Sequence, residues 1–572
     1  MSSSLKILHR SAAELLACTV LEVFPNTKLI RGYSTDIGFA YEFVFPQTID
    51  DHDISLIEEK MRMLLKKNLP IKLIEMMRDN AAEFFRHHGQ EIFAEHVVTA
   101  PSNVIELFHV EGFHGYSPAP YIKNTKEIGA CKLLGFSQRK QLFFGKDSYE
   151  VTRIEGVAFS TTKELKKFLK RYEEAEKRDH QRLGPELELF TRQDEAGPGC
   201  WYWLPKGAII REILLDLYKT ELRKRGYDLV STPRIVSKDF LASSRFHLPE
   251  SQNLAEISVC GRPYLLATDL TPMHVQLYQT KRRSYRELPL KLAEIAEVYS
   301  PIKPNDLCGL FRSRLFTTDA AHCFCSENIA QEELISSLQF IGESINMFRI
   351  ECKWYLVSKK PKTNVTKAYW DQGVELAEKA IKHCGFDFTI DTDQVSIGGP
   401  KIEARLVDAL GREWPGPSVQ VSLFPKETTL QYRGSDDQMH RPIVIASALF
   451  GSLERFVAIL IEKHGGFFPL WLAPEQVRVI PVMEHHLSYS ETVWKQLQQQ
   501  GIRASIDKKN DTLAAKVYAA KRAKVPYVVI VGDTEKQNGT IAVRPFQDQG
   551  KGRKESVDAF VESIQKEIDE SA

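Results

Sequence analysis

The sequence predicts a multidomain protein that combines α+β and α/β folds, and three observations support this. The chain has 572 residues, more than one hydrophobic core usually holds, so several domains are expected. Hydrophobic residues make up 43% and charged residues 26%, which is ordinary for globular proteins. The hydrophobic pattern also changes along the chain, from mixed strand-like and helix-like runs to regular alternation of strands and helices.

Residues 1–160 are expected to form an α+β domain. The run at 37–45 (IGFAYEFVF) is typical of a strand, and the run at 54–67 (ISLIEEKMRMLLKK) is typical of a helix. Residues 161–184 are polar, rich in helix formers and free of proline. They predict a solvent-exposed linking helix that ends at Gly184.

Residues 185–474 hold most of the aromatic residues and many strand-like runs, which predicts a large antiparallel sheet carrying helices. The last segment, 475–572, has a different pattern. Its strand-like runs VRVIPV (477–482), IRASID (502–507) and YVVIVG (527–532) alternate with amphipathic helices near 490–500 and 511–523. This order predicts a small α/β domain of the βαβ type.

Charge and cysteine usage limit the functional classes. Lys and Arg total 76 against 75 Asp and Glu, so any nucleic-acid contact must come from a local patch rather than from overall charge. The nine cysteines are scattered, which favours a reducing, cytoplasmic setting over a disulfide framework. No apolar run is long enough to span a membrane, and the first residues lack the apolar stretch of a signal peptide, so no membrane partner is expected.

Several segments resemble the core of class II aminoacyl-tRNA synthetases, and specifically the threonyl-tRNA synthetase family. They are 178-RDHQRLGPELELF-190, 197-GPGCWYWLPKGAIIREIL-214, 226-GYDLVSTPRI-235, 285-YRELPLKLAE-294 with the hairpin up to 325, and 441–477. The first 160 residues resemble the editing domain of that family, without the small ubiquitin-like domain that usually precedes it. The resemblance implies an antiparallel class II core, an editing-like domain, an anticodon-binding domain at 475–572, and ATP-dependent joining of threonine to tRNA.

The resemblance also indicates that the aminoacylation site is degenerate. The family places an Arg on the first hairpin strand, where it holds the α-phosphate of ATP, and a Glu two residues later that contacts adenine. Here these positions carry Ser300 and Ile302. A serine hydroxyl cannot replace a guanidinium fork, and loss of one such electrostatic contact typically costs about 10²–10³ in rate.

The zinc ion that binds threonine in the family is expected to be absent. Its Cys position is Thr271 and one of its His positions is Ala446, which leaves His322 alone. The Arg beside the second His is replaced by Ser447. Catalytic zinc sites usually take three protein ligands, so the favoured interpretation of His322 is a packed or hydrogen-bonded histidine.

Some positions keep the residue types of the family. The resemblance assigns Arg312, Lys401, Gln420, Arg455 and His322 to a residual nucleotide and amino-acid pocket, and Glu454 is also the residue that the family has at its position. A weak ATP and Mg²⁺ site is therefore one interpretation. The alternative is that these residues now join the sheet and its helix through ion pairs.

The editing positions all differ from the family pattern. Its HxxxH pair becomes Arg10 and Glu14, and its later Cys and His become Ser117 and Tyr121. Arg10 and Glu14 lie one helical turn apart, so a surface salt bridge is expected in place of a hydrolytic site.

In contrast to the core, the C-terminal segment keeps the residue types that the family has at its base-reading positions. The resemblance assigns base recognition to Asn510, Glu535 and Arg544. Amide, carboxylate and guanidinium groups can supply the edge hydrogen bonds that read an unpaired base. The alternative for each is an exposed polar residue of a small α/β domain.

The leading interpretation is a catalytically degenerate relative of threonyl-tRNA synthetase that binds tRNA of the threonine type or a protein partner. A homodimer is expected because Pro233 lies in a segment resembling the dimer-forming motif of the family. The alternative is an active enzyme, either a divergent threonine–tRNA ligase or a ligase for another small amino acid.

Overall fold

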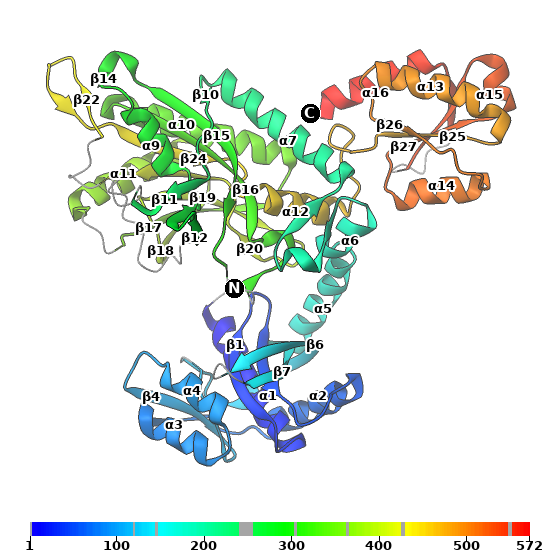
Figure 1. Ribbon diagram of the computed structural model, residues 1–572. Coiled ribbons are helices and arrows are strands. Elements are labelled where there is room, and N and C mark those ends of the chain that lie inside the picture. The colour runs from blue at the N-terminus through cyan, green and yellow to red at the C-terminus, as the bar shows by residue number, and fades with distance from the viewer. Residues whose placement is uncertain are drawn as a thin grey trace. The chain divides into compact units, whose positions relative to one another are not determined.

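The computed structural model describes residues 3–117, 120–143, 147–239, 255–302, 306–361, 365–424, 430–546 and 552–571. The chain divides into two compact units, Met1–Glu174 and Ala175–Ala572 (Figure 1). In the described residues, no helix is both long and apolar enough to cross a membrane. The α+β and α/β multidomain class predicted from the sequence is confirmed.

The first unit is built around a long buried helix, α1 (Ser3–Val23), which packs on a four-stranded sheet of order β1-β2-β7-β6. The strands of that sheet are β1 (Lys28–Ser34), β2 (Phe39–Val44), β6 (Ala130–Phe143) and β7 (Asp147–Phe159). A second sheet has the order β3-β4-β5, with β3 (Lys72–Met77), β4 (Val104–Val110) and β5 (Phe113–Gly115). The remaining helices are α2 (Asp51–Lys66), α3 (Arg78–His87) and α4 (Glu91–Val98).

The predicted linking helix is wrong in one respect. The segment forms two helices, α5 (Thr162–Glu176) and α6 (His180–Glu186), in place of one that ends at Gly184. Gly184 lies inside α6, where an added Cβ would lie 2.2 Å from the ring of Phe190. This glycine therefore permits a close packing contact instead of ending a helix.

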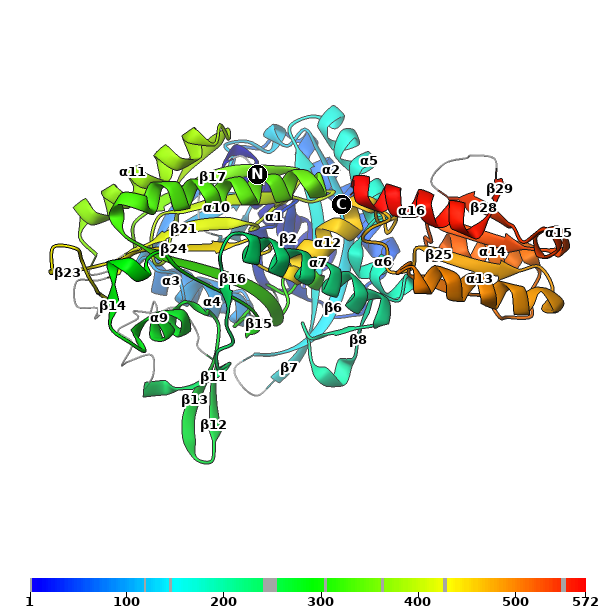
Figure 2. The ribbon, with the colours of Figure 1, turned by 90° about the horizontal axis from the view of Figure 1, so that it is seen from above.

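The second unit contains a nine-stranded, mostly antiparallel sheet of order β10-β15-β16-β24-β21-β19-β17-β18, with β20 paired to β19. Its bounds are β10 (Asp228–Leu229), β15 (Leu290–Tyr299), β16 (Leu315–Cys325), β17 (Cys352–Lys359), β18 (Phe388–Val395), β19 (Lys401–Val407), β20 (Glu413–Trp414), β21 (Ser418–Ser422) and β24 (Ile443–Ala448). Helices α7 (Pro205–Lys224), α10 (Glu327–Phe348), α11 (Lys367–His383) and α12 (Leu453–His464) accompany it (Figure 2).

Smaller elements surround this sheet. They are β8 (Phe190–Arg192), β9 (Trp201–Trp203), β11 (Ile235–Ser237), β12 (Glu256–Val259), β13 (Arg262–Leu266), α9 (Thr271–Gln279), β14 (Arg283–Ser284), β22 (Tyr432–Arg433) and β23 (Met439–His440). The hairpin of β12 and β13 projects from the core in Figure 2.

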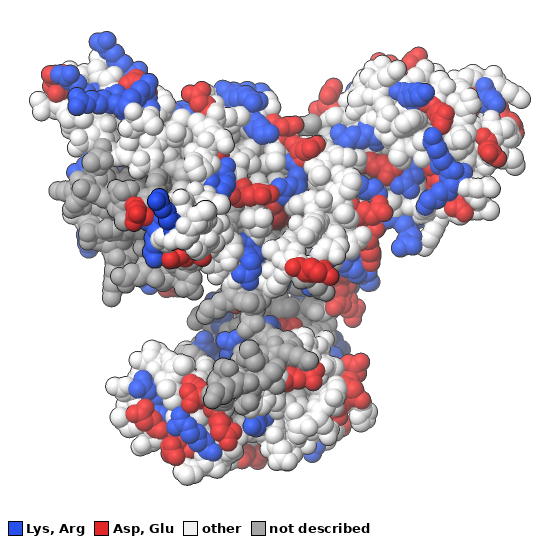
Figure 3. All heavy atoms as spheres, in the orientation of Figure 1, with Lys and Arg blue, Asp and Glu red and all other residues white. Residues whose placement is uncertain are grey.

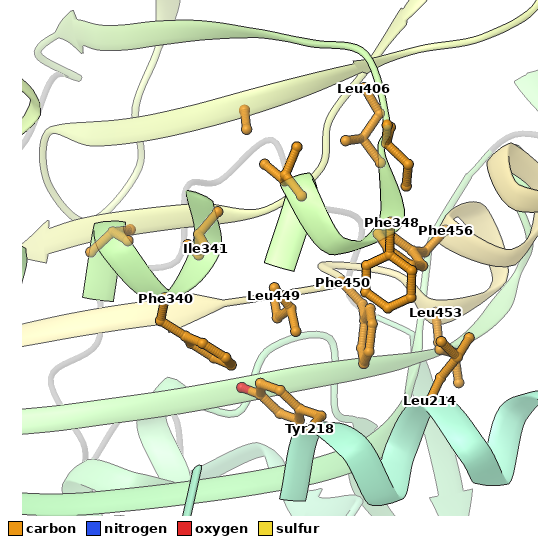
Figure 4. Close-up of a cluster of buried hydrophobic side chains, with 14 of the residues drawn as sticks. Leu214, Tyr218, Phe340, Ile341, Phe348, Leu406, Leu449, Phe450, Leu453 and Phe456 are labelled. Atoms are coloured by element: carbon orange, nitrogen blue, oxygen red, sulfur yellow. The ribbon is translucent and has the colours of Figure 1, made fainter. Parts of the chain in front are cut away.

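The main hydrophobic core lies between the large sheet and its helices. Tyr218 from α7 lies beside Phe340 from α10 and contacts Phe450, which follows β24 and packs against Phe456 of α12 (Figure 4). The rings of Tyr218 and Phe450 lie 5.6 Å apart, and those of Phe450 and Phe456 lie 5.0 Å apart. Burial of apolar surface such as these rings is the main favourable contribution to folding, so this cluster holds the helices α7, α10 and α12 on the large sheet.

The C-terminal part has the predicted βαβ pattern. Strands β25 (Val477–Pro481), β26 (Ala504–Ile506) and β27 (Tyr527–Val531) are parallel, and β28 (Ile541–Pro545) and β29 (Arg553–Glu555) extend the sheet antiparallel in the order β26-β25-β27-β28-β29. Helices α13 (Leu487–Gln499), α14 (Leu513–Arg522), α15 (Asp533–Asn538) and α16 (Val557–Ser571) complete it. The carboxyl ends of the parallel strands lie at one edge, where α/β sheets commonly bind ligands.

Candidate active site and anticodon interface

The hairpin of β15 and β16 positions the predicted phosphate-binding residues. Tyr299 ends β15. The amide of the next residue, Ser300, donates to the carbonyl of Arg314, which immediately precedes β16, at 2.7 Å. The guanidinium of Arg314 is itself engaged, because Nη1 donates to Tyr299 Oη at 3.2 Å and Nε donates to the carbonyl of Pro198 at 3.3 Å. The cation adjoining Ser300 in the hairpin therefore holds the hairpin together.

The three predicted zinc positions come together in space. His322 of β16 is the register partner of Ala446 of β24, and His322 Nε2 lies 3.1 Å from Thr271 Oγ1, at the start of α9. Ser447 follows Ala446 and pairs with Ala321. The three positions meet, and their side chains offer one imidazole, one hydroxyl and one methyl group.

A second histidine, which the sequence analysis missed, completes a buried chain of hydrogen bonds. His322 Nδ1 lies 2.9 Å from His274 Nδ1, and His274 Nε2 lies 3.3 Å from Glu294 Oε2. Glu294 also accepts from Arg234 at 2.7 Å. A signal was present in the sequence, because His274 stands three residues after Thr271 and so shares one face of α9.

The ionisation of this chain follows from its surroundings. Burial alone would raise the pKa of Glu294, but hydrogen bonds from His274, Arg234 and Thr232 lower it to about 2, so the group is a carboxylate. Burial also lowers the pKa of His322 well below its usual value, and the neighbouring His274 adds to this effect. His322 is therefore neutral at physiological pH.

Both ring nitrogens of His322 are engaged. Nδ1 lies 2.9 Å from His274 Nδ1 and Nε2 lies 3.1 Å from the Thr271 hydroxyl, which itself donates to Asp269 Oδ1 at 2.9 Å. The nitrogens of His322 that could bind a metal therefore contact other protein groups instead. With neither thiolate nor second free imidazole at these positions, the donor set does not fit zinc.

The retained pocket residues are engaged with the protein itself. Arg455 Nε donates to the carbonyl of Phe311 at 3.0 Å, and its Nη1 donates to the carbonyl of Pro415 at 2.7 Å. Burial lowers the pKa of Arg455 to about 10, and nearby Arg312 contributes to that shift. Arg312 lies over the ring of Trp414, 5.0 Å from its centroid.

Two further pocket residues, both on strands, show the same pattern. Gln420 Nε2 donates to the carbonyls of Ile397, at 2.6 Å, and Gly399, at 2.9 Å, and so fastens the turn before β19. Lys401 lies 3.4 Å from Glu403 in an ion pair along β19. These contacts connect the large sheet internally.

Glu454 joins α12 to helix α7 by an ion pair and to strand β16 by hydrogen bonds, and Arg455 takes no part in these contacts. Glu454 accepts from Arg211 of α7 at 2.6 Å and from the amide of Thr317 at 2.7 Å. Asp319, two residues along β16, accepts from the backbone amides of Leu449, Phe450 and Gly451. Burial raises the pKa of Asp319, and these amides oppose the shift.

The predicted Arg10–Glu14 surface salt bridge is wrong. Glu14 has no exposed area, and neither carboxyl oxygen makes a hydrogen bond to another described residue. Burial raises the pKa of Glu14 to about 8, with a small opposing effect of Ser117. The error arose because helical spacing shows which residues share a face, and this face of α1 is turned into the protein.

The four editing positions nevertheless lie close together at Glu14. An added Cβ on Gly115 would lie 2.1 Å from Glu14 Oε2, and Tyr121 donates its hydroxyl to the carbonyl of Ser117 and accepts from the Ser117 amide at 2.8 Å. The hydroxyl of Tyr41 is also buried and unbonded. His9, one residue from Arg10, contacts the carbonyl of Ala158 at 2.9 Å.

The predicted anticodon residues lie in three different settings. Asn510 is exposed in the loop after β26, and Arg544 is exposed on β28; within the described residues neither side chain has a hydrogen bond or ion pair. Glu535 of α15 is buried, accepts from the amide of Gly532 at 3.1 Å and pairs with Lys554 at 2.8 Å. The Lys554 contact lowers the pKa of Glu535.

Three groups of His and acidic residues could approach a metal elsewhere in the described ranges: His485, His486 and Asp533; Asp179, His180 and Glu462; and Asp50, His52 and Asp53. In the first, His486 Nδ1 accepts from the amide of Met483, so the ring proton lies on Nε2 and points to Asp533. In the second, His180 Nε2 accepts from the amide of Leu310. In the third, Asp50 and Asp53 form the capping box of α2.

Comparison with known protein families assigns two parts of the second unit. A family model described as "tRNA synthetase class II core domain (G, H, P, S and T)" matches residues 258–464. A model described as "Anticodon binding domain" matches residues 476–567. These ranges contain the β15–β16 hairpin and the Asn510, Glu535 and Arg544 positions respectively.

Relatives match along nearly the full length. The chain is 37% identical to a threonine–tRNA ligase of Sulfurihydrogenibium sp. over 99% of this chain and 89% of that protein. It is 34% identical to one of Acidobacterium capsulatum over 98% of this chain and 83% of that protein. A crystal structure titled as the RNA binding domain of threonyl-tRNA synthetase from Cryptosporidium parvum is similar, with a TM-score of 0.65, 28% identity, and coverage of 68% of this chain and 98% of that one. The chain belongs to the threonyl-tRNA synthetase family.

Proposed function

We propose that this family member binds tRNA of the threonine type through its C-terminal domain and does not charge it. The observation that carries the proposal is the state of the family's catalytic positions in the core. Ser300 and Ile302 supply no guanidinium and no carboxylate, and His322 is hydrogen-bonded where a metal would bind. One of the two retained arginines, Arg455, has two donors on backbone carbonyls.

Adenylate formation needs charge stabilisation at the α-phosphate and a hold on the amino acid. Preorganised donors usually supply the largest single contribution to such a reaction. Neither Ser300 nor the Thr271–His322–His274 chain can supply these two functions. ATP with Mg²⁺ is at most a weak ligand under this proposal, and zinc is not a cofactor.

The anticodon domain supports the binding half of the proposal. Asn510 and Arg544 are exposed, and they are the residue types that read unpaired bases by hydrogen bonds to their edges. As part of the same proposal, the protein is a cytoplasmic homodimer joined through the segment around Pro233, and it can also act through a protein partner.

The test combines two assays on the full-length protein. Amino-acid-dependent pyrophosphate exchange with a panel of all twenty amino acids should stay at background. A gel-shift assay should show preference for a threonine-type tRNA over other tRNAs. Exchange above background with any amino acid would favour the alternative, an active ligase for threonine or another small amino acid, and a lack of tRNA preference would contradict the binding proposal.

A further inference from the structure

A cavity on the core, outside all the positions discussed above, has a composition suited to a nucleotide. It has a volume of about 330 Å³ and lies beside the starts of α10 and α11 and the small sheet β14-β22-β23. Its lining includes Glu327, Tyr369, Gln372, Tyr432, His440 and Arg441. Ligand pockets typically start at about 300 Å³, so this cavity can hold a single small ligand.

We propose that this cavity takes one unpaired nucleotide of an RNA chain, with the adjoining basic strip holding the phosphates on either side. The basic strip comprises the exposed residues Lys281, Arg282, Arg286, Arg433 and Arg441, of which Lys281 pairs with Glu287 at 3.2 Å and Arg433 with Asp437 at 2.6 Å. The site belongs to the core and is separate from the anticodon residues, so it goes beyond the proposed anticodon contact.

One wall of the cavity is aromatic. Tyr369 of α11, Phe424 and Tyr432 of β22 all line it, and the rings of Tyr432 and His440 are 5.7 Å apart. Every nucleobase has a flat apolar face, and its stacking on an aromatic side chain is worth about 1–3 kcal/mol. This wall accounts for binding of a base without selecting among bases.

The polar wall adds a preference. Gln372 Nε2 donates to Glu327 Oε1 at 2.8 Å, which fixes a carboxylate at the cavity. An ionised carboxylate only accepts hydrogen bonds, so it favours a base whose edge donates. Guanine offers adjacent N1–H and N2–H donors, whereas uracil offers a single N3–H donor between two carbonyl groups.

Basic residues lie beside the cavity. Strand β14 pairs with β22, Arg283 opposite Tyr432, so the segment 281–286 lies directly beside the cavity. Figure 3 shows Lys and Arg gathered over β14 and β22. Among the described residues, Arg282 and Arg286 form no ion pair, and Arg286 lies over the 42% exposed Tyr285, at 5.7 Å. Cations beside aromatic rings are the usual composition of single-strand binding surfaces.

The experiment uses the full-length protein and a labelled purine pentanucleotide RNA that lacks a threonine anticodon, followed by fluorescence anisotropy. Arg441→Glu and Gln372→Leu should each weaken binding at least tenfold. Arg282→Glu combined with Arg286→Glu should weaken it and reduce the slope of log K against log salt by about 1.4, since each phosphate contact on a single strand contributes about 0.7. The matched control is Lys379→Glu on α11, a 65% exposed lysine that does not line the cavity.

The outcomes separate this site from the anticodon site. Binding of the probe should survive Asn510→Ala and Arg544→Ala; loss of binding in those variants would overturn the inference and leave the anticodon proposal standing. Unchanged binding in Arg441→Glu and Gln372→Leu, or equal weakening in Lys379→Glu, would also overturn it. GMP and UMP are added as competitors: displacement by GMP identifies free nucleotide as a second source of the ligand, and stronger displacement by UMP would contradict the role of Glu327.

Discussion

The core and the C-terminal domain of this protein differ in how their family-type polar residues are used. In the core, Arg455 and Gln420 donate hydrogen bonds to backbone carbonyls, and both ring nitrogens of His322 contact other side chains. In the C-terminal domain, Asn510 and Arg544 are exposed and have no partner among the described residues. A residue whose hydrogen bonds are already satisfied can be kept for stability alone, whereas an exposed, unsatisfied one is available to a ligand.

Restoring the zinc ligands is the strongest way to sharpen this comparison. The double variant Thr271→Cys with Ala446→His should bind one zinc ion at least a thousandfold more tightly than the unmodified protein, because the three positions already converge. Metal content after dialysis and cobalt absorption measure this. Thr271→Cys alone is the control, and failure of the double variant would show that more than side-chain identity has changed.

The buried Glu14 extends the comparison to the editing positions. Its pKa is raised to about 8, against about 4.5 in the unfolded chain, so the folded state holds a proton that the unfolded state releases. Stability should therefore fall as pH rises from about 4.5 to about 8 and level off above that. Glu14→Gln should remove this dependence and be more stable by a few kcal/mol at pH 9, with little difference at pH 5.

Scanning calorimetry of the full chain at several pH values measures that effect. Glu22→Gln is the matched control, because Glu22 lies on the same helix α1 but is 53% exposed and pairs with Lys60 at 3.4 Å. An unchanged pH profile in Glu14→Gln would show that this carboxyl is solvated.

The anticodon residues give the next largest effect. Asn510→Ala and Arg544→Ala should each weaken binding of threonine-type tRNA by about 1–3 kcal/mol, which is the usual cost of one lost base contact, and should reduce the preference over other tRNAs. Filter binding measures both quantities. Lys566→Ala, which changes a 74% exposed lysine on α16, should leave both unchanged. Equal effects in all three variants would indicate that the domain binds tRNA through unspecific charge and not through contacts of Asn510 and Arg544 with bases.

Glu535 is the exception within the C-terminal domain, and its ion pair gives the smallest expected effect. Lys554 is 60% exposed, and such pairs contribute about 0–1 kcal/mol. Lys554→Ala should therefore change tRNA affinity less than about fivefold, whereas Glu535→Ala should lower it about tenfold if the carboxylate contacts a base. A larger loss in Lys554→Ala would indicate that the lysine contacts the RNA itself.

The sequence predicted the family, the fold class and the alternation of strands and helices in the C-terminal domain, because hydrophobic periodicity and motif spacing are local signals. It also predicted that Thr271, His322 and Ala446 would share a site. It did not predict His274 or Arg211, whose roles depend on contacts across 48 and 243 residues respectively. The burial of Glu14 was missed for a related reason: periodicity defines a helix face, but tertiary packing decides what covers it.

Strand β16 carries anchoring residues and a position of the candidate site on opposite sides. Neighbouring side chains on a strand point to opposite sides. Thr317 and Asp319 point one way and anchor Glu454 and the 449–451 turn, whereas Thr318, Ala320 and His322 point the other way. His322, the site position on this strand, therefore lies on the second side and the anchoring residues lie on the first. Because the anchoring contacts and the site position lie on opposite sides of one strand, side chains on the site face can change while the contacts on the other face keep the protein folded.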